Sequence, residues 1–355
     1  MGTARADRLV ERLAERELDY LLVTNLVNVR YLAGFTGTNG VCVVGRDERL
    51  FLTDFRYVER AKLEVPDFER LRGKQDLIGD AAERLSGRVG FEDQHMSVRQ
   101  FRRLQELVGE RAELVAAGGL VEDLRAVKES DELRSIREAA DLADDMYEYL
   151  CSRGLVGRTE RDVALDLERE MRDRGAEDPS FPSIVAGGAH GALPHAQPRP
   201  ERIQPNTLVI VDMGCRLDGY CSDCTRTFAT GEIDDEAGAV YELVLSAQQE
   251  ALAAVRAGAD ERAVDSVARD RIAEAGHGEH FGHGLGHGVG LEVHEAPRLA
   301  QTAEGALAAG NVVTVEPGVY LPGAFGVRIE DLVIVTEDGS EVLSHFPKAL
   351  VTLDA

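Results

Sequence analysis

Two aspartates, Asp212 and Asp223, lie in a stretch typical of a β-hairpin, TLVIVDMGCRLDGYCSDCTRTFAT. Asp218 and Gly219 separate its two β runs and form the residue pair that two-residue type I′ turns prefer. A turn there places Asp223 opposite Gly214, with Asp212 on the same face as a diagonal neighbour roughly 7–8 Å away by Cα. A solvated acidic hairpin is the alternative, but the apolar run before Asp212 predicts burial. Two buried carboxylates at this distance need a cation, such as a metal ion, to neutralise them.

The same hairpin contains a C-x-x-C pair, Cys221 and Cys224, whose spacing also occurs in redox dithiols and zinc sites. Because side chains alternate along a strand, Cys221 shares the face of Asp223 and Cys224 points to the opposite face. On a regular strand the two thiols therefore cannot jointly hold one zinc ion or easily close a disulfide. We interpret the cysteines as incidental and the aspartate as the functional residue, and a redox protein is the alternative.

Two glycine-rich segments, GGAHGALPHAQP and HFGHGLGHGVGLEVHE, supply candidate histidines. The glycines of the second segment make a helix improbable, and the H-E-x-x-H motif of helical zinc peptidases is absent. We therefore predict a loop that enters a strand, where the backbone can approach a ligand closely. The histidines of the two segments are His190, His195, His280, His283, His287 and His294.

Two glutamates also adjoin apolar β runs. Glu316, in TVEPGVY, follows an apolar strand, and Glu330 lies inside the apolar run VRIEDLVIVT. An exposed sheet edge is the alternative for each, but the flanking Val and Ile residues predict burial, and buried glutamate needs a partner. Four carboxylates with one or more histidines suit a pair of divalent ions, with Mn²⁺ first and Co²⁺ or Zn²⁺ as alternatives. Such a pair would hold a hydroxide nucleophile and stabilise a tetrahedral intermediate.

The elements that position these residues fall into two predicted domains, an α/β domain at 1–125 and an α+β domain at 126–355. In the second domain we expect long helices on a largely antiparallel sheet. In the first we find no catalytic cluster. Its expected strands are 19–24, 40–45, 49–54, 88–92 and 112–117, and its expected helices are 5–17, 56–64, 76–85 and 97–108. The helices expected in the second are 130–152, 158–174, 235–257 and 261–275.

The composition argues against several classes of function. A formal net charge of −24 repels nucleic acid and anionic lipid. No apolar run approaches the roughly 20 residues of a transmembrane helix, and the N-terminus has no apolar signal core. We therefore expect a cytoplasmic protein that binds neither nucleic acid nor membrane. Acidic residues spread along the whole chain also suggest the hypothesis of a salt-adapted source.

The candidate residues resemble the metal ligands of the pita-bread metallopeptidases, which include aminopeptidase P, prolidase and methionine aminopeptidase. Residues 127–353 look like the catalytic domain of that family, and residues 1–125 look like the creatinase-type N-terminal domain of its proline-directed members. The implied catalytic fold is an antiparallel sheet covered by helices, in pseudo-two-fold halves. The family's ligand order matches Asp212 in VDMG, Asp223 in SDCTRT, His287 in GHGVGL, Glu316 in VEPG and Glu330 in RIED.

The resemblance also implies roles. Asp223 and Glu330 resemble the ligands that bridge the two ions, and Glu316 resembles the carboxylate that relays a proton to the leaving amine. His195 in LPH and His294 in EVHE resemble histidines that contact substrate and steady the developing oxyanion.

Three further residues match positions around the ligands. His283 looks like an additional active-site histidine, and Arg328 resembles an arginine near the bridging carboxylates. Tyr320 is expected to line the site.

The implied activity is that of a dinuclear-metal exopeptidase acting on the Xaa-Pro bond, at the N-terminus of short peptides or in dipeptides. Aminopeptidase P and prolidase stay open as alternatives, and the N-terminal domain is expected to restrict access to short, unstructured peptides. Methionine aminopeptidase fits less well because it usually lacks such a domain, and creatinase because it lacks the metal ligands. An inactive pita-bread-fold binding protein is the non-enzymatic alternative, which the intact ligands disfavour. The family also implies a homodimer.

Overall fold

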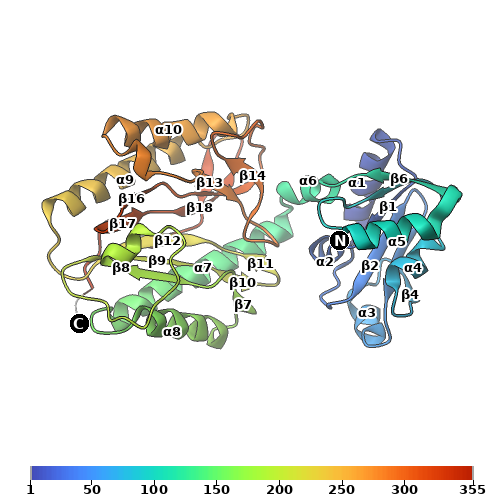
Figure 1. Cartoon of the computed structure of the whole chain (residues 1–355), viewed down its shortest axis with the longest axis horizontal. Coiled ribbons are helices and arrows are strands. Elements are labelled where there is room, and N and C mark those ends of the chain that lie inside the picture. Colours follow the sequence, from blue (N-terminus) through green and yellow to red (C-terminus); the bar gives the residue numbers. More distant parts are fainter. Residues whose placement is uncertain (1, 354–355) are drawn as a thin grey trace. The chain divides into compact units, whose positions relative to one another are not determined.

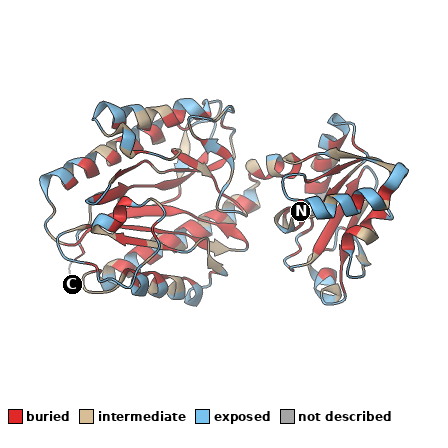
Figure 2. Ribbon diagram, in the orientation of Figure 1, coloured by how far each residue is buried: buried red, intermediate tan, exposed pale blue. Residues whose placement is uncertain are grey.

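The chain divides into two units, Met1–Arg125 and Ala126–Ala355 (Figure 1). The computed structural model describes residues 2–353, and the side chains of residues 4–353. In each unit the strands are largely buried, and buried and exposed residues alternate along the helices (Figure 2). Within the described part of the chain, no helix is both long and apolar enough to span a membrane.

The first unit is built on one six-stranded sheet, in the order β4-β3-β2-β1-β5-β6. Neighbours among β1, β2 and β3 are antiparallel, whereas β4, β5 and β6 each join the sheet in parallel. The strands are β1 (Tyr20–Val23), β2 (Gly40–Gly45), β3 (Arg49–Thr53), β4 (Glu69–Arg72), β5 (Gly87–Phe91) and β6 (Ala112–Ala116). The helices are α1 (Gly2–Glu15), α2 (Leu26–Ala33), α3 (Val58–Glu64), α4 (Leu77–Ala82), α5 (Val98–Val108), the 3₁₀ helix η1 (Gly109–Arg111) and α6 (Leu120–Ala126), which ends at the boundary.

Alternation along the strands explains how helices cover this sheet. Leu22, Val41 and Val43 occupy alternate positions of β1 and β2 and belong to one buried cluster with residues of α4 and α5. Helices α1 and α2 also contact β2. The structure contains every strand and helix expected for this unit, together with α2, β4, η1 and α6, which are not among the expected elements.

The second unit holds antiparallel sheets between two pairs of helices (Figure 1). One pair is α7 (Ser130–Arg153) and α8 (Glu160–Asp173), and the other is α9 (Asp235–Ala254) and α10 (Glu261–Glu274). The strands are β7 (Asp178–Pro179), β8 (Ile184–Gly187), β9 (Leu208–Met213), β10 (Cys215–Leu217), β11 (Tyr220–Cys221), β12 (Cys224–Ala229), β13 (Gly286–Gly288), β14 (Glu295–Leu299), β15 (Val312–Val315), β16 (Gly318–Leu321), β17 (Phe325–Arg328), β18 (Asp331–Val335) and β19 (Ser340–Val342). Two 3₁₀ helices are η2 (Gly188–Ala192) and η3 (Gly278–His280).

Each helix pair packs on its own strands. Helices α7 and α8 share a buried cluster with β8, β9 and β12, which form one sheet. Helices α9 and α10 share another with β15, β16, β17 and β18. Each half is therefore an antiparallel arrangement of strands backed by two helices, which is the α+β fold that the sequence predicts.

The hairpin that carries Asp212 forms in the predicted register. Asp218 and Gly219 make its turn with φ of 49° and 85°, and positive φ at both central residues is what a type I′ turn requires. The Cα partner of Asp212 is Thr225, as a turn at this position dictates. The Asp-Gly pair therefore fixes which side chains face Asp212.

Candidate metal centre

The four candidate carboxylates lie near points where a hairpin passes from one sheet into another. Asp212 is the last residue but one of β9, and Asp223 lies between β11 and β12. Glu316 lies between β15 and β16, and Glu330 lies between β17 and β18. The two ladders of each hairpin belong to different sheets, so the carboxylates are placed at the bends.

The register of the second hairpin pairs its two glutamates. The ladder of β15 and β18 ends with Val315 opposite Asp331, and the ladder of β16 and β17 continues the same register beyond the gap. Glu316 and Glu330 therefore occupy opposite positions within the gap.

In the first hairpin, a glycine occupies the position opposite one of the carboxylates. Gly214 occupies the position opposite Asp223, and a Cβ at Gly214 would lie 1.9 Å from the backbone oxygen of Ser222. No side chain fits there, because real Cβ atoms do not approach so closely. Glycine thus allows the segment that carries Asp223 to lie directly against its partner strand.

Glycines also place His287. A Cβ on Gly286 would lie 2.0 Å from the backbone oxygen of Thr314, and one on Gly288 would lie 2.1 Å from that of Ala296. His287 is therefore the only side chain of the short strand β13. Its Nδ1 atom lies 3.1 Å from the oxygen of Gly288, which leaves Nε2 available as a ligand.

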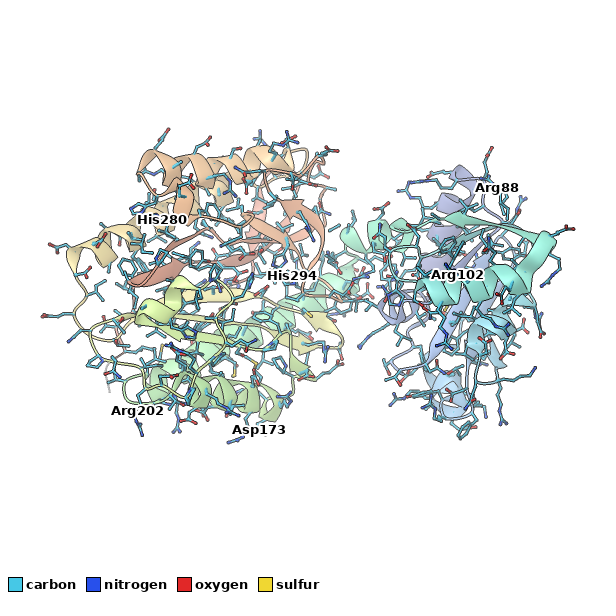
Figure 3. All side chains as sticks on the ribbon, viewed as in Figure 1. Arg88, Arg102, Asp173, Arg202, His280 and His294 are labelled. Carbon is cyan, nitrogen blue, oxygen red and sulfur yellow. The ribbon has the colours of Figure 1, made fainter. Side chains whose placement is uncertain are left out.

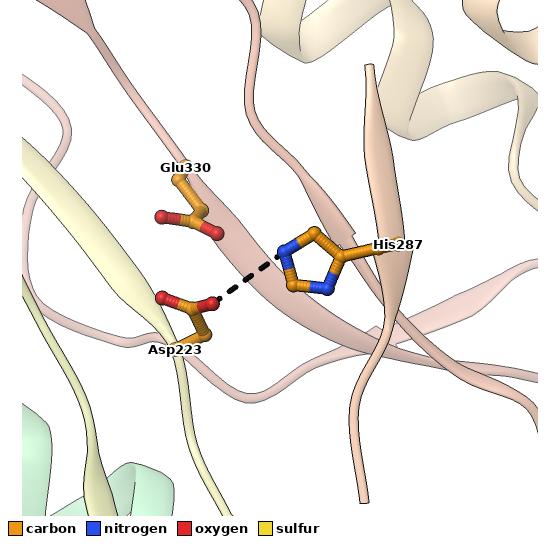
Figure 4. A group of neighbouring side chains, drawn as sticks. All are labelled: Asp223, His287 and Glu330. Atoms are coloured by element: carbon orange, nitrogen blue, oxygen red, sulfur yellow. Dashed lines mark ion pairs between the residues drawn. The ribbon is translucent and has the colours of Figure 1, made fainter. Parts of the chain in front are cut away.

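Three side chains converge closely. Asp223, His287 and Glu330 each offer a ligand atom within 4.8 Å of the others (Figure 4). His287 Nε2 lies 3.6 Å from Oδ2 of Asp223 and 3.3 Å from Oε1 of Glu316. Carboxylate oxygens with one imidazole nitrogen form a donor set for a divalent transition-metal ion.

Asp212 has one satisfied and one unsatisfied oxygen. Its Oδ2 atom accepts a hydrogen bond from Nη2 of Arg328 at 2.5 Å. Its Oδ1 atom is buried and has no hydrogen-bond partner among the described residues. An unpaired buried carboxylate oxygen is costly, and such groups in native proteins call for a ligand or ion. The residues of this centre therefore fit a bound metal.

Thr225 connects the two hairpins. Its hydroxyl donates a 2.7 Å hydrogen bond to Oε2 of Glu330 and accepts one of 3.0 Å from Nε of Arg328. Thr225 is a site residue that was not predicted from the sequence. Its position opposite Asp212 in the predicted hairpin register could have identified it.

The crowding of acids shifts their pKa values. Burial raises the pKa of Asp223 well above its ordinary value, and the charges of Glu330 and Asp212 raise it further. Burial likewise raises the pKa of Glu330, reinforced by Glu316 and Asp212. Burial acts in the same direction on Glu316, but the hydrogen bond and charge of His287 outweigh it and lower its pKa to about 2. Protein groups alone therefore do not neutralise the whole cluster, which is consistent with a cation site.

A cavity of about 560 Å³ opens over these side chains. All five predicted ligands line it, together with His195, His283, His294 and Arg328. The lining also includes apolar side chains and one further cationic side chain that are not among the residues predicted from the sequence. These additional residues are Phe181, Pro182, Ile184, Pro194, Ala196, Ala300 and Arg298.

Tyr320 supports the cavity from within the protein. It is 6% exposed and lies behind the cavity-lining residues His283 and Arg328, and its predicted role at the site stays a prediction. Arg328 Nη1 donates to its hydroxyl at 2.9 Å, and the hydroxyl lies 2.9 Å from Nε2 of His283. Because Nδ1 of His283 lies 2.8 Å from the oxygen of Gly284, Nδ1 carries the proton and Nε2 accepts from Tyr320.

Two exposed histidines face the same cavity. The ring of His294 lies 4.3 Å from that of His287, centroid to centroid. His195 lies in the loop that follows η2. Both side chains are therefore accessible from the cavity.

A buried glutamate, Glu160, anchors the loop of His195. Its Oε1 atom accepts from the backbone N–H of Gly187 at 3.0 Å, and its Oε2 atom accepts from that of Arg199 at 3.0 Å. The same Oε2 atom lies 2.8 Å from Nδ1 of His190. Glu160 is the first residue of α8. Because it lies far from the loop in sequence, no local pattern predicted this contact.

The cysteines take no part in this centre. All five are free, and Cys221 and Cys224 pack in different buried clusters. Strand β11 ends at Cys221 and β12 begins at Cys224, so regular alternation stops between them. Neither thiol lines the cavity, and the C-x-x-C pair supplies none of the clustered ligand atoms in the described chain.

Comparison with known proteins agrees with this geometry. Residues 134–337 match the model of metallopeptidase family M24, and residues 5–127 match that of the creatinase/prolidase N-terminal domain. A Xaa-Pro dipeptidase of Pyrococcus furiosus is 33% identical over 358 residues, which cover 98% of this chain and 99% of that protein.

Solved structures give the same result. The structure of a Xaa-Pro dipeptidase from Bacillus anthracis matches with a TM-score of 0.96 at 40% identity, covering 99% of this chain and 100% of that one. That of an X-Pro aminopeptidase from Thermotoga maritima MSB8 matches with a TM-score of 0.90 at 35% identity, covering 98% and 100%. The chain therefore belongs to metallopeptidase family M24, as a metallo-exopeptidase with a creatinase/prolidase-type N-terminal domain, which confirms the resemblance and the fold inferred from the sequence.

Proposed function

We propose that this protein is a dinuclear-metal dipeptidase that hydrolyses the bond between an N-terminal residue and proline. The observation that carries the proposal is the convergence of Asp212, Asp223, His287, Glu316 and Glu330 on one cavity, where a buried oxygen of Asp212 has no protein partner among the described residues. The relatives named as Xaa-Pro dipeptidase and X-Pro aminopeptidase support the proline specificity.

These five residues would hold two divalent ions. Asp223 and Glu330 would be the shared ligands, as the family resemblance implies, and Asp212, His287 and Glu316 would complete the ligand set. Four carboxylates and a single imidazole favour Mn²⁺, and Co²⁺ or Zn²⁺ are the alternatives. When bound, such ions supply an activated water nucleophile and polarise the scissile carbonyl.

Side chains around the ligands would handle protons and bind substrate. Glu316 lines the cavity beside His287, where its carboxylate would accept a proton from the nucleophile and pass it to the leaving nitrogen of proline. Partial desolvation at the cavity wall and the neighbouring charge of His287 lower the pKa of His294, so its imidazole is neutral and offers one N–H. His195 and His294 would donate hydrogen bonds to the substrate and to the developing oxyanion.

The remaining lining favours a dipeptide. Phe181, Pro182 and Ile184 give the cavity apolar surface that suits a proline ring. Arg298 is exposed and lies opposite His287 in the sheet, where it would bind a carboxylate. A carboxylate directly after proline occurs only in a dipeptide, so Arg298 favours prolidase activity over aminopeptidase P activity.

Initial rates with matched substrates test this proposal. The substrates are an Xaa-Pro dipeptide, the same dipeptide as its C-terminal amide, and an Xaa-Pro-Xaa tripeptide, each with chelated enzyme before and after addition of Mn²⁺, Co²⁺ or Zn²⁺. Fastest hydrolysis of the free dipeptide supports the proposal, and faster hydrolysis of the tripeptide assigns aminopeptidase P instead. The absence of hydrolysis of any substrate with every metal overturns it.

The homodimer and the cytoplasmic location stay predictions. Light scattering on the purified protein and fractionation of the source cells test them.

A further inference from the structure

The segment that joins α10 to β13 carries two histidines for which the proposed activity has no role. His277 is the residue before the 3₁₀ helix η3, and His280 is its last residue. A 3₁₀ helix has three residues per turn, so side chains three positions apart lie on the same side. The sequence HGEH in this conformation therefore brings the two imidazoles together.

The distance between the two rings suits a shared metal ion. Nδ1 of His277 lies 3.4 Å from Nδ1 of His280, and the ring centroids are 5.5 Å apart. A separation of 3.4 Å is long for a hydrogen bond between two ring nitrogens. Two nitrogens bound to one zinc ion at about 2.0–2.1 Å with a tetrahedral angle are separated by about 3.3–3.4 Å. The observed spacing is that of two adjacent corners of a tetrahedral site.

Backbone hydrogen bonds hold this arrangement. The N–H of His277 donates to the oxygen of Ile272 at 3.1 Å, and the N–H of His280 donates to the oxygen of His277 at 2.9 Å. Ile272 is fully buried in the core beneath α9 and α10. Gly276 has a φ of 89°, which lets the chain leave α10 and enter η3. The two rings are thus attached to a well-packed part of the second unit.

We propose that His277 and His280 form a second metal site, specific for a nitrogen-preferring divalent ion such as Zn²⁺, Ni²⁺ or Cu²⁺. Neither residue lines the catalytic cavity, and His280 lies apart from cavity-lining His294 (Figure 3). The two imidazoles would occupy two coordination positions of the ion, and water molecules would occupy the others. The preference differs from that of the oxygen-rich centre, because imidazole suits Zn²⁺ and Cu²⁺ whereas carboxylates suit Mn²⁺.

The site would also fix the segment that leads to His283. Phe281 follows His280 directly, and its ring packs edge-on against that of His283 with centroids 5.1 Å apart. The guanidinium of Arg269 lies 4.3 Å from the centroid of the Phe281 ring. An ion at the histidine pair would therefore hold the start of a segment whose end faces the cavity.

Metal counting on the Mn²⁺-loaded protein tests the proposal. The wild type, His277→Gln, His280→Gln and a control, His345→Gln, are dialysed against the same Zn²⁺ solution, and bound zinc is counted by mass spectrometry. His345 is an exposed histidine outside the pair. Zinc that exchanges into the catalytic centre does so equally in all four proteins. The wild type and the control are expected to retain one more zinc per chain than either pair variant, and equal counts in all four overturn the proposal.

A spectroscopic measurement does not depend on the folding of any one variant. Cu²⁺ added to the Mn²⁺-loaded wild type is expected to give an electron paramagnetic resonance signal coupled to two nitrogens. That signal should be lost in both pair variants and kept in the control. A signal without nitrogen coupling in the wild type, or one that both variants retain, contradicts the site.

Discussion

Arg328 donates a hydrogen bond from Nη2 to Oδ2 of Asp212 at 2.5 Å, while Oδ1 of the same aspartate is buried without a partner in the described structure. The arginine is itself 3% exposed and also binds Thr225 and Tyr320. It therefore fixes the orientation of the aspartate and leaves one oxygen for a ligand. Arg328 thus connects Thr225 and Tyr320, which lie around the proposed metal centre, to the predicted ligand Asp212.

Replacement of this arginine should weaken metal binding. Arg328→Met removes the donor that orients Asp212, and loss of such a supporting contact typically lowers metal affinity by about 10–100-fold. Titration calorimetry with Mn²⁺ measures the change. Arg137→Gln, which removes an exposed ion pair with Glu341, is the matched control and should bind as the wild type does. An Arg328→Met protein with unaltered Mn²⁺ affinity would show that the contact does not act on the metal.

The hydroxyl of Thr225 should stabilise the site even without metal. Thr225→Val keeps the shape of the side chain but removes the donor to buried Glu330, and an unsatisfied buried group of this kind costs roughly 1–3 kcal/mol. Thr225→Ser keeps the hydroxyl and should lose less. Urea unfolding of the metal-free proteins compares the free energies of unfolding. Equal stability of the Val and Ser variants would refute the role of the hydrogen bond.

Glu160 should make the stability of the folded protein decrease at acidic pH. Burial raises its pKa, but the Arg199 side chain and the backbone N–H groups of Gly187 and Arg199 outweigh burial and lower the value below the ordinary 4.5. A lowered folded-state pKa contributes stability above the unfolded value, and this contribution is lost as the pH falls through the folded value. Between neutral pH and strongly acidic pH, the melting temperature of wild type should therefore fall more than that of Glu160→Gln. Parallel pH profiles for the two proteins would disagree with this assignment.

Arg298 should determine the preferred substrate length. Arg298→Met removes the partner proposed for the substrate carboxylate, so kcat/KM for an Xaa-Pro dipeptide should fall by roughly 10–100-fold, since a charged hydrogen bond contributes about 1.5–3 kcal/mol. The rate with the dipeptide amide, which has no carboxylate, should change little and serves as the internal control. An equal loss for both substrates would indicate a general effect on the site.

The part of the site that follows from local sequence could be predicted. The Asp218-Gly219 pair sets the register that places Thr225 opposite Asp212, because a two-residue turn leaves one pairing for every later residue. The low helix propensity of the glycines around His287 made a helix improbable, and in the structure these glycines let neighbouring backbone approach closely. The identity of the ligand set came from the family resemblance.

Contacts between distant segments could not be predicted. Glu160 and Arg298 reach the site only through the packing of α8 and β14, and neither carries a local motif.

Two short elements of the first unit could not be predicted for the same reason. Strand β4 reads ERLR, an exposed edge without apolar alternation, and α2 has only eight residues with apolar side chains on several sides. Their structure depends on neighbours in space more than on local pattern.

The decisive test of the metal centre is hydrolysis of an Xaa-Pro dipeptide by Asp223→Ala, measured beside the wild type after chelation and reconstitution with Mn²⁺. The structure places Asp223 against His287 and Glu330, so its loss should remove a bridging ligand while the fold is kept. We expect an inactive wild type after chelation, recovery with Mn²⁺, and a folded Asp223→Ala protein without turnover. Full turnover by the variant, or by the chelated wild type, would contradict it.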